Sequence, residues 1–292
     1  MKAETDNKNT INILTDARHG WRKNAKQTDV VCIGAKTKRV LYVSTITKEV
    51  DDVAQRHELH GTKEIYRHIA DKGLGVAAHC HDNNAVITKY VRESQPATRN
   101  QLDNWHALKS FEKAIKGITK GPKKNHGKTW HFQLTDKAHS LRTHVNFCLS
   151  KCNDDAQTLQ TTLLACIEHY KNNHSQCFPT ARCKQDPNYE PSRIVITDVI
   201  AEQMLRNAII SSNVYRKASL YTMNMSTAHV VSFNNQLSIF QDKRICFGNI
   251  AYKMRTKLAV CIWNENQTLE CKKRSYEDFL FRHQILYKYL GI

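Results

Sequence analysis

Several features on which common classes of protein depend are missing from this sequence. No stretch approaches the roughly 18 consecutive apolar residues of a membrane span. Its first residues, MKAETDNKNT, lack the apolar core of a secretory signal. Internal repeats and low-complexity blocks are absent too, and the 40% of hydrophobic residues suffice for a folded core. These absences predict a folded, soluble, intracellular protein with no membrane partner.

Acidic side chains are scarce relative to basic ones. The chain has 44 Lys and Arg against 27 Asp and Glu, a formal net charge of +17 with an isoelectric point near 9.5. Residues 99–144 hold ten Lys and Arg but only three acidic residues, with Trp105, Phe111, Trp130 and Phe132 among them. Bound cations release the counterions of phosphates, and aromatic faces stack on bases. The composition therefore favours a nucleic-acid partner, although a merely basic protein also fits it.

The first hundred residues alternate between strand and helix patterns. Short β-rich runs at 10–16, 29–34 and 39–47 predict a three-stranded meander. A helix pattern over 61–73, a strand run ending at Asp82 and a helix from about 84 to 92 follow. This order is typical of an α/β protein with a mixed sheet.

The rest of the chain reads as mainly helical. Apolar residues recur at helical spacing over 101–118, and a basic Gly/Pro loop follows over 116–128. Further helices are expected over 134–174 with a break near KCNDDAQ, over 194–218, around 228–241, and as an amphipathic tail over 276–290. Residues 179–193, with three prolines, are expected to form a second loop.

Carboxylates stand where two predicted strands end. Asp16 closes the first strand and Asp82 the fourth. Because neighbouring strands can bring such side chains together, they suit Mg²⁺ or Mn²⁺, which prefer oxygen ligands. A divalent site of this kind can activate a water or hydroxyl for attack on a phosphodiester. The competing interpretation is a turn former or helix N-cap, which Asp82 also fits.

The same residues carry a resemblance to a known family. Asp16 and Asp82 are followed by DNWHALKSFEKAIKGI (103–118), which has the form D-x-W-H-x-x-K. The pattern continues through TWHFQLTDKAHSLRTHVNFCLSKC (129–152), IEHYKNNHSQC (167–177) and residues 225–266. Over nearly its whole length the chain resembles ribonuclease-H-fold transposases, and it is most similar to transposase-derived proteins of animal DNA transposons.

The resemblance implies a fold, an activity and a set of domains. The fold would be a ribonuclease-H-like mixed sheet flanked by helices, with a helical Cys/His-bearing insertion. The core would comprise 10–118 and 219–266, the insertion 119–218, and a C-terminal helix 267–292. The activity would be DNA strand cleavage and transfer, with two Asp, here the catalytic candidates Asp16 and Asp82, and one Glu holding divalent metal.

The third acidic position departs from this pattern. The resemblance places a Glu in a T-x-x-x-E segment on a late helix, but the residue four after Thr227 is Val231. A valine side chain cannot ligate a cation, so the centre is expected to be impaired. His229 points to the opposite helix face and cannot substitute for the Glu. A substitute carboxylate, Glu202 or Glu112, would instead leave an active Mg²⁺-dependent nuclease or transposase.

Lysines concentrate in the helix and loop that follow the second Asp. The resemblance implies DNA contact or structural support for Asp103, Trp105, His106 and Lys109, whereas a core Trp105 beside a solvated stripe is the alternative. The residues that we predict to contact DNA are Lys109, Lys113, Lys116, Lys120, Lys123, Lys124 and Lys128.

The ten cysteines of the sequence are expected to be thiols or metal ligands rather than disulfides. Cys32, Cys246 and Cys261 sit in apolar runs and are expected in the core. Zn²⁺ takes four N or S ligands, and the spacing predicts a structural site at Cys148, Cys152, His174 and Cys177. Cys183 or His144 could replace a member, and buried free thiols are the competing interpretation.

Together these patterns predict a transposase-like nucleic-acid-binding protein, located in the nucleus and partnered by double-stranded DNA. Asp16 and Asp82 should lie close together on neighbouring strands, with Val231 facing them from a helix. A homo-oligomer is compatible with the sequence. A non-catalytic DNA- or RNA-binding chromatin module and a decayed transposon fragment are further interpretations.

Overall fold

A five-stranded mixed sheet lies at the centre of the structure, a computed structural model that describes residues 1, 3–5, 9–20 and 26–267. The strand order is β3-β2-β1-β4-β5. The first three strands form an antiparallel meander, whereas β4 runs parallel to β1 and β5 parallel to β4. The strands are β1 (Thr10–His19), β2 (Gln27–Gly34), β3 (Val40–Thr47), β4 (Gly75–His81) and β5 (Arg99–Leu102).

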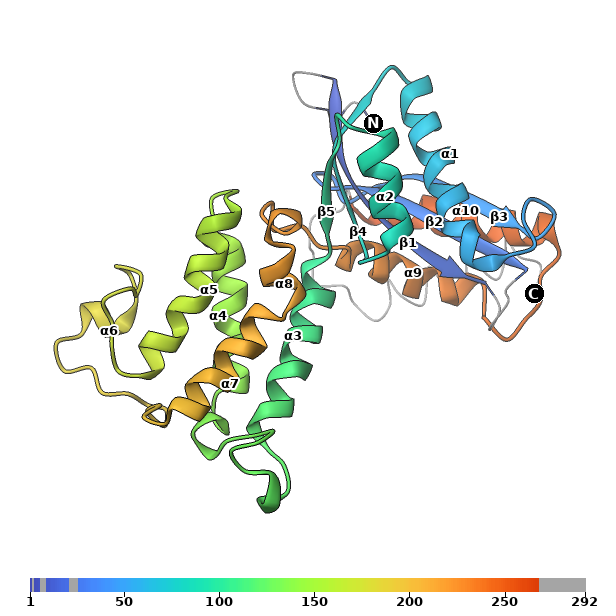
Figure 1. Ribbon diagram of the computed structural model, residues 1–292. Coiled ribbons are helices and arrows are strands. Elements are labelled where there is room, and N and C mark those ends of the chain that lie inside the picture. The colour runs from blue at the N-terminus through green and yellow to red at the C-terminus, as the bar shows by residue number, and fades with distance from the viewer. Residues whose placement is uncertain (2, 6–8, 21–25, 268–292) are drawn as a thin grey trace, which may run out of the picture.

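Helices cover both faces of this sheet (Figure 1). One face packs on α1 (His57–Asp71) and α2 (Ala85–Ser94), the other on α9 (Ala228–Phe240) and α10 (Asn249–Asn266). Side chains alternate between the faces of a strand, so a strand covered on both sides is apolar throughout. In β2, Val30 and Cys32 pack towards α1, whereas Val31 and Ile33 pack towards α9 and α10.

A helical part lies beside the sheet and shares one apolar core of its own (Figure 1). The chain leaves β5 directly into α3, whose buried face carries Leu108, Phe111 and Ile115 into that core. Its helices are α3 (Asn104–Thr119), α4 (Ala138–Lys151), α5 (Ala156–Tyr170), α6 (Arg182–Gln185), α7 (Val199–Ile210) and α8 (Asn213–Arg216). None of the helices described is long and apolar enough to cross a membrane.

The predicted meander, and the α/β class with a mixed sheet flanked by helices, are confirmed. The four-residue strand β5 and the helix α10 were not predicted. The tail helix expected over 276–290 lies outside the described residues. Cys32 is buried as expected, but Cys246 and Cys261 are exposed, because neither lies on the inward face of its segment. The division into domains stays a prediction.

The packing of α1 on the sheet depends on a helical glycine. A Cβ at Gly61 would lie 2.3 Å from Val30 Cγ2. Gly61→Ala is therefore expected to lower the free energy of unfolding by about 1–3 kcal/mol through overpacking, despite the better helix propensity of alanine.

Gly117→Ala in α3 is the matched control, because nothing lies within 4 Å of its added Cβ. That variant should be as stable as the wild type or more so by up to about 1 kcal/mol. Urea unfolding of both variants measures the difference, and equal stabilities would contradict the close approach of α1 to β2.

Candidate functional site

Parallel pairing of β1 with β4 places Asp16 and Asp82 side by side. Leu14 of β1 is the register partner of Cys80 of β4, and two residues further along stand Asp16 and Asp82. Asp82 directly follows β4 as expected, but Asp16 does not close its strand, because pairing with β2 continues β1 to His19. Burial, and next the charge of Asp82, raise the pKa of the Asp16 carboxyl from 3.8 to about 6. The expectation that the two carboxylates converge is thus met by the structure. Their catalytic role stays a prediction.

Helix α9 reaches this pair from the next layer. Asn234 Nδ2 donates to Asp16 Oδ2 at 2.9 Å, and the backbone N–H of Ala17 donates to Asp16 Oδ1 at 2.9 Å. Val231 lies three residues before Asn234 and therefore on the same helix face. Its half-buried side chain offers no oxygen where the resemblance expects one. The carboxylates of Glu112 and Glu202, considered as substitutes, instead form ion pairs with Lys and Arg side chains within the helical part.

The start of α3 contributes a histidine to the site. His106 Nδ1 lies 2.6 Å from Asp103 Oδ2 and 3.1 Å from Asp82 Oδ1. Asp103 is buried, caps α3 by accepting from the His106 backbone N–H, and accepts from the Thr227 backbone N–H at 2.8 Å. It thereby joins the start of α3 to the start of α9. The N-cap of α2 is Asn84, so Asp82 is not held in place by capping that helix.

Glu58 is a further carboxylate near Asp16 and Asp82 that was not predicted from the sequence. Burial raises its pKa from 4.5 to about 7, a hydrogen bond from Asn84 Nδ2 opposes the rise, and the charges of Asp16 and Asp82 add to it. Glu58 stands in the first turn of α1, three residues before residue 61, where the helix was expected to begin. No spacing links it to Asp16 or Asp82, and only the sheet order brings α1 over them.

Among the described residues, the ligand atoms of Asp82, Asp103 and His106 lie within 4.8 Å of one another and could hold a metal ion, whereas Asp16 and Glu58 stand outside that group. Asp16, Asp82 and Glu58 supply carboxylate oxygens, the ligands that Mg²⁺ and Mn²⁺ prefer. Asn234 Oδ1 is buried and accepts no hydrogen bond within the described part of the chain. The same holds for Asp82 Oδ1, although His106 Nδ1 is 3.1 Å away. Buried oxygens without donors are uncommon, and a cation would satisfy them.

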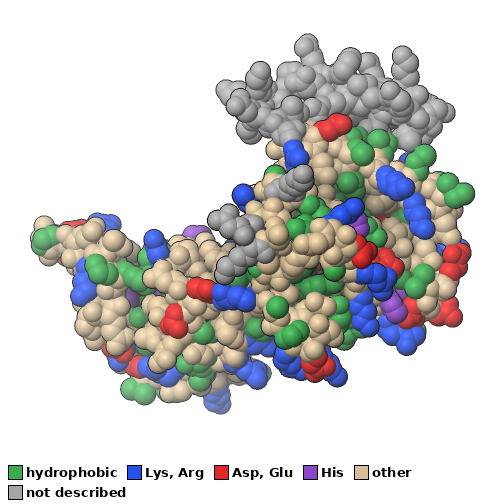
Figure 2. All heavy atoms as spheres, turned by 90° about the horizontal axis from the view of Figure 1, so that it is seen from above, with side chains coloured by type: hydrophobic (Ala, Val, Ile, Leu, Met, Phe, Trp, Pro, Cys, Tyr) green, Lys and Arg blue, Asp and Glu red, His purple; other side chains and the backbone are tan. Residues whose placement is uncertain are grey.

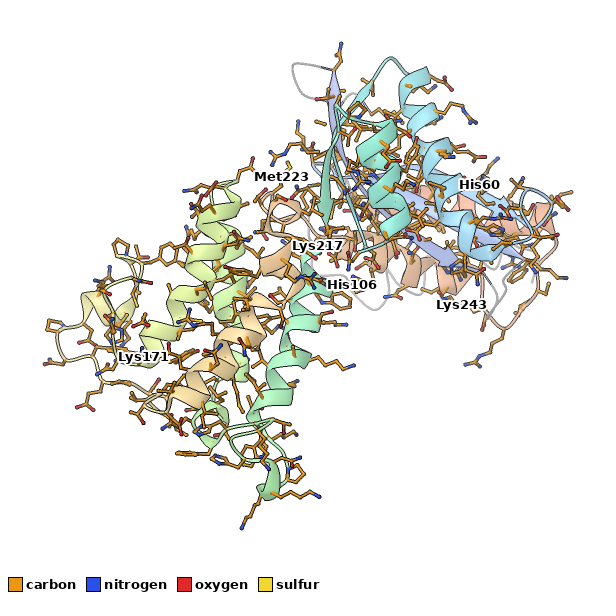
Figure 3. The ribbon with its side chains drawn as sticks, viewed as in Figure 1. His60, His106, Lys171, Lys217, Met223 and Lys243 are labelled. Carbon is orange, nitrogen blue, oxygen red and sulfur yellow. The ribbon has the colours of Figure 1, made fainter. Side chains whose placement is uncertain are left out.

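Basic side chains lie along α3 and in the loop that follows it. The seven lysines predicted to contact DNA are all exposed, and Lys109 Nζ stacks 3.2 Å from the centroid of the half-buried Trp105 ring. Lys217, which follows α8, donates to Asn83 Oδ1 at 2.7 Å and lies near His106 at the junction of the two parts (Figure 3). In Figure 2, Lys and Arg side chains occur over both parts with acidic ones among them. The DNA contacts stay a prediction.

The predicted zinc ligand set requires a correction. Cys148 and Cys152 are buried in the helical core, where Cys148 lies beside His144 and Cys152 donates to backbone carbonyls. They point into that core because they lie on the inward face of α4. His174 and Cys177 meet two other residues, His169 and Cys183, in a half-buried group that could hold a metal ion. Cys183 was considered as a replacement ligand, but His169 was not.

No family model matches this chain, and no curated protein matches it.

The raised pKa of Asp16 gives a pH-dependent prediction. A carboxyl whose folded pKa lies above its ordinary value stabilises the fold below about pH 4, and this contribution is lost as the pH rises through about 6. Without divalent metal, Asp16→Asn should therefore raise stability at pH 7 by up to about 3 kcal/mol and flatten the decline between pH 4 and 6. It should also abolish the rise in Tm that we expect Mn²⁺ to give the wild type. Thermal unfolding with EDTA or Mn²⁺ measures both effects.

Asp71→Asn is the charge-matched control, since Asp71 is exposed at the end of α1. It should keep the wild-type response to Mn²⁺. If Asp16→Asn is less stable than the wild type at pH 7, the Asp16 carboxyl does not destabilise the fold. If its Tm still rises with Mn²⁺, Asp16 does not bind the cation.

Proposed function

We propose that this chain is a transposase-like nucleic-acid-binding protein, derived from a metal-dependent DNA strand cleavage and transfer enzyme and impaired in that chemistry. The observation that carries the proposal is that Asp16, within β1, and Asp82, directly after the parallel neighbour β4, lie close enough to interact electrostatically. The order β3-β2-β1-β4-β5, with helices on both faces, supports a ribonuclease-H-like fold. Helix α9 lies against Asp16, where the resemblance expects the third ligand.

Double-stranded DNA is the partner that the charge favours, and the nucleus is the corresponding location. The net charge of +17 favours a polyanion. Helix α3 starts beside the carboxylates, and Lys109, Lys113 and Lys116 follow at spacings of four and three, so they form one exposed stripe that leads away from the site. A backbone held along this stripe would pass close to Asp82. A second copy of the chain would extend the same surface.

Asp16 and Asp82 would hold Mg²⁺ or Mn²⁺. When bound, such an ion activates a water or hydroxyl and stabilises the leaving oxygen of a phosphodiester. Asp103 fixes the ring of His106 beside Asp82, and Asn234 orients the carboxylate of Asp16. The missing donor at Val231 weakens the hold on a cation and so impairs the chemistry. Zinc, the other ion predicted from the sequence, concerns the His/Cys group and has no part in this chemistry.

Glu58 favours a second candidate function, an active Mg²⁺-dependent nuclease or transposase. The charges of both Asp16 and Asp82 raise the pKa of its carboxyl, which supports Glu58 as a substitute for the donor missing at Val231. Cation binding would draw the proton from this carboxyl, whose pKa near 7 makes the ionised form accessible at neutral pH. A non-catalytic DNA- or RNA-binding module would need neither residue.

Restoring the acidic residue tests the proposal directly. Val231→Glu should raise the rate of Mn²⁺-dependent nicking of supercoiled DNA at least about tenfold, equivalent to about 1.4 kcal/mol of transition-state stabilisation. Val231→Gln is the matched control, because it has the same length without the charge. Adding Asp82→Asn to Val231→Glu should abolish the gain.

The nicking activity of the wild-type protein distinguishes between the two candidate functions. Nicking above background that Asp82→Asn and Glu58→Gln each abolish would establish the active enzyme and overturn the impaired one. No gain from Val231→Glu, together with DNA binding that persists in EDTA and in Asp16→Asn, would leave only a binding module.

The lysine stripe predicts how DNA binding responds to salt. Replacing Lys109, Lys113 and Lys116 by Ala removes up to three phosphate contacts and should reduce the slope of log K against log salt by about 0.9 per contact. Fluorescence anisotropy with a labelled duplex measures the slope. Replacing Lys48, Lys72 and Lys89 of the sheet-bearing part removes the same charge and is the control. Equal slopes for the two triple variants would contradict a role for α3 in binding.

A further inference from the structure

Four metal-binding side chains converge at the end of α5. The ligand atoms of His169, His174, Cys177 and Cys183 all lie within 4.8 Å of one another. The Nδ1 atoms of the two histidines are 3.2 Å apart. His169 Nδ1 lies 3.4 Å from the sulfur of Cys177 and 3.7 Å from that of Cys183, and His174 Nδ1 lies 3.8 Å from that of Cys177.

These separations match the edges of a zinc tetrahedron. Bonds of about 2.0–2.1 Å to nitrogen and about 2.3 Å to sulfur in regular tetrahedral geometry separate two nitrogens by about 3.4 Å and a nitrogen from a sulfur by about 3.6 Å. The measured contacts of 3.2 Å and 3.4–3.8 Å fall around these values. Two nitrogens and two sulfurs are a donor set that selects zinc over the hard divalent cations.

One ligand is already oriented for a metal. His174 Nε2 lies 3.0 Å from Asn172 Oδ1, an acceptor to which the ring N–H donates. The other ring nitrogen, Nδ1, is then unprotonated and faces the group. Such a hydrogen bond on the far nitrogen is the usual support of a ligating histidine.

Ion pairs of Lys171 with Glu168 and Glu202 hold one end of the segment that carries three of the ligands, and hydrogen bonds of Ile194 with Asp136 and Lys137 hold the other. The middle of the segment is less well anchored. No residue from Lys171 to Val195 is buried, and α6 is its only helix in the described chain. Its ring contacts include those of Phe178 with Phe147 of α4 and of Tyr189 with His169 and His174 of the group. A structured segment of this length needs an anchor to offset its conformational entropy, and apolar burial does not provide one.

We propose that His169, His174, Cys177 and Cys183 bind one Zn²⁺ that fastens the segment 171–195 to the end of α5. All four positions are taken by protein side chains, so the site is structural and closed to substrate. It is independent of the function of the carboxylate site. Loss of the metal would release the segment and leave the sheet and the helical core intact.

Metal content and cobalt substitution test the proposal on the full chain. Purified protein should contain one zinc per chain, and Co²⁺ in its place should show the visible bands of a tetrahedral site with thiolate charge transfer. Cys177→Ser and Cys183→Ser should each weaken Zn²⁺ binding more than the roughly 10–100-fold typical of losing a hydrogen bond to a ligand. Cys246→Ser, which removes an exposed thiol elsewhere, should bind as tightly as the wild type.

Limited proteolysis separates the anchoring role from global unfolding. Chelation, or either ligand substitution, should expose 171–195 to cleavage while the circular dichroism spectrum stays close to that of the wild type. Less than a tenth of a zinc per chain, or full zinc binding by both ligand variants, would overturn the proposal. Zinc lost from Cys148→Ser but kept by Cys183→Ser would overturn this ligand set in favour of one on α4.

Discussion

The parallel hydrogen bonding between β1 and β4 is the constraint on which the candidate site depends. It aligns Leu14 with Cys80 and therefore brings Asp16 of the central strand β1 beside Asp82, which follows β4. Two carboxylates held this way repel each other, and burial disfavours their ionised forms, so the pKa of Asp16 rises. Holding two buried carboxylates side by side costs free energy of folding, and such pairs are typical of sites that bind a cation.

The two parts of the molecule meet at this same edge. Asp103 follows β5, begins α3 and accepts from the backbone N–H of Thr227 at the start of α9. The sheet is therefore connected to the helical part through the first turn of α3, which carries His106. Lys217, from the end of the helical part, returns to Asn83 beside Asp82. Packing of the helical part thus bears directly on the geometry around the carboxylates.

The two groups of candidate metal ligands differ in their donor atoms. Around Asp16 the donors are oxygens, unequal in burial and partly without hydrogen-bond donors, which suits a hard cation that exchanges ligands. At the end of α5 two imidazoles and two thiols form a closed set, which suits a cation that stays. The Cys/His group lies in the helical part, at the end of α5, whereas the carboxylates lie beside the sheet.

The sequence by itself predicted the meander, the strand before Asp82 and the helices α1 to α5 and α9 within a few residues, because hydrophobic periodicity is a local property. It did not predict that β1 continues beyond Asp16 or that α6 lies in the second loop. Tertiary structure alone decided the rest. The strand β5, four residues of RNQL, exists only through its pairing with β4. Glu58 joins the site because α1 crosses the sheet above it. His169 and Cys183 take the places expected for Cys148 and Cys152, because those two thiols are buried in the helical core, whereas the end of α5 meets the loop that carries His174. Spacing along a chain does not encode such meetings between distant segments.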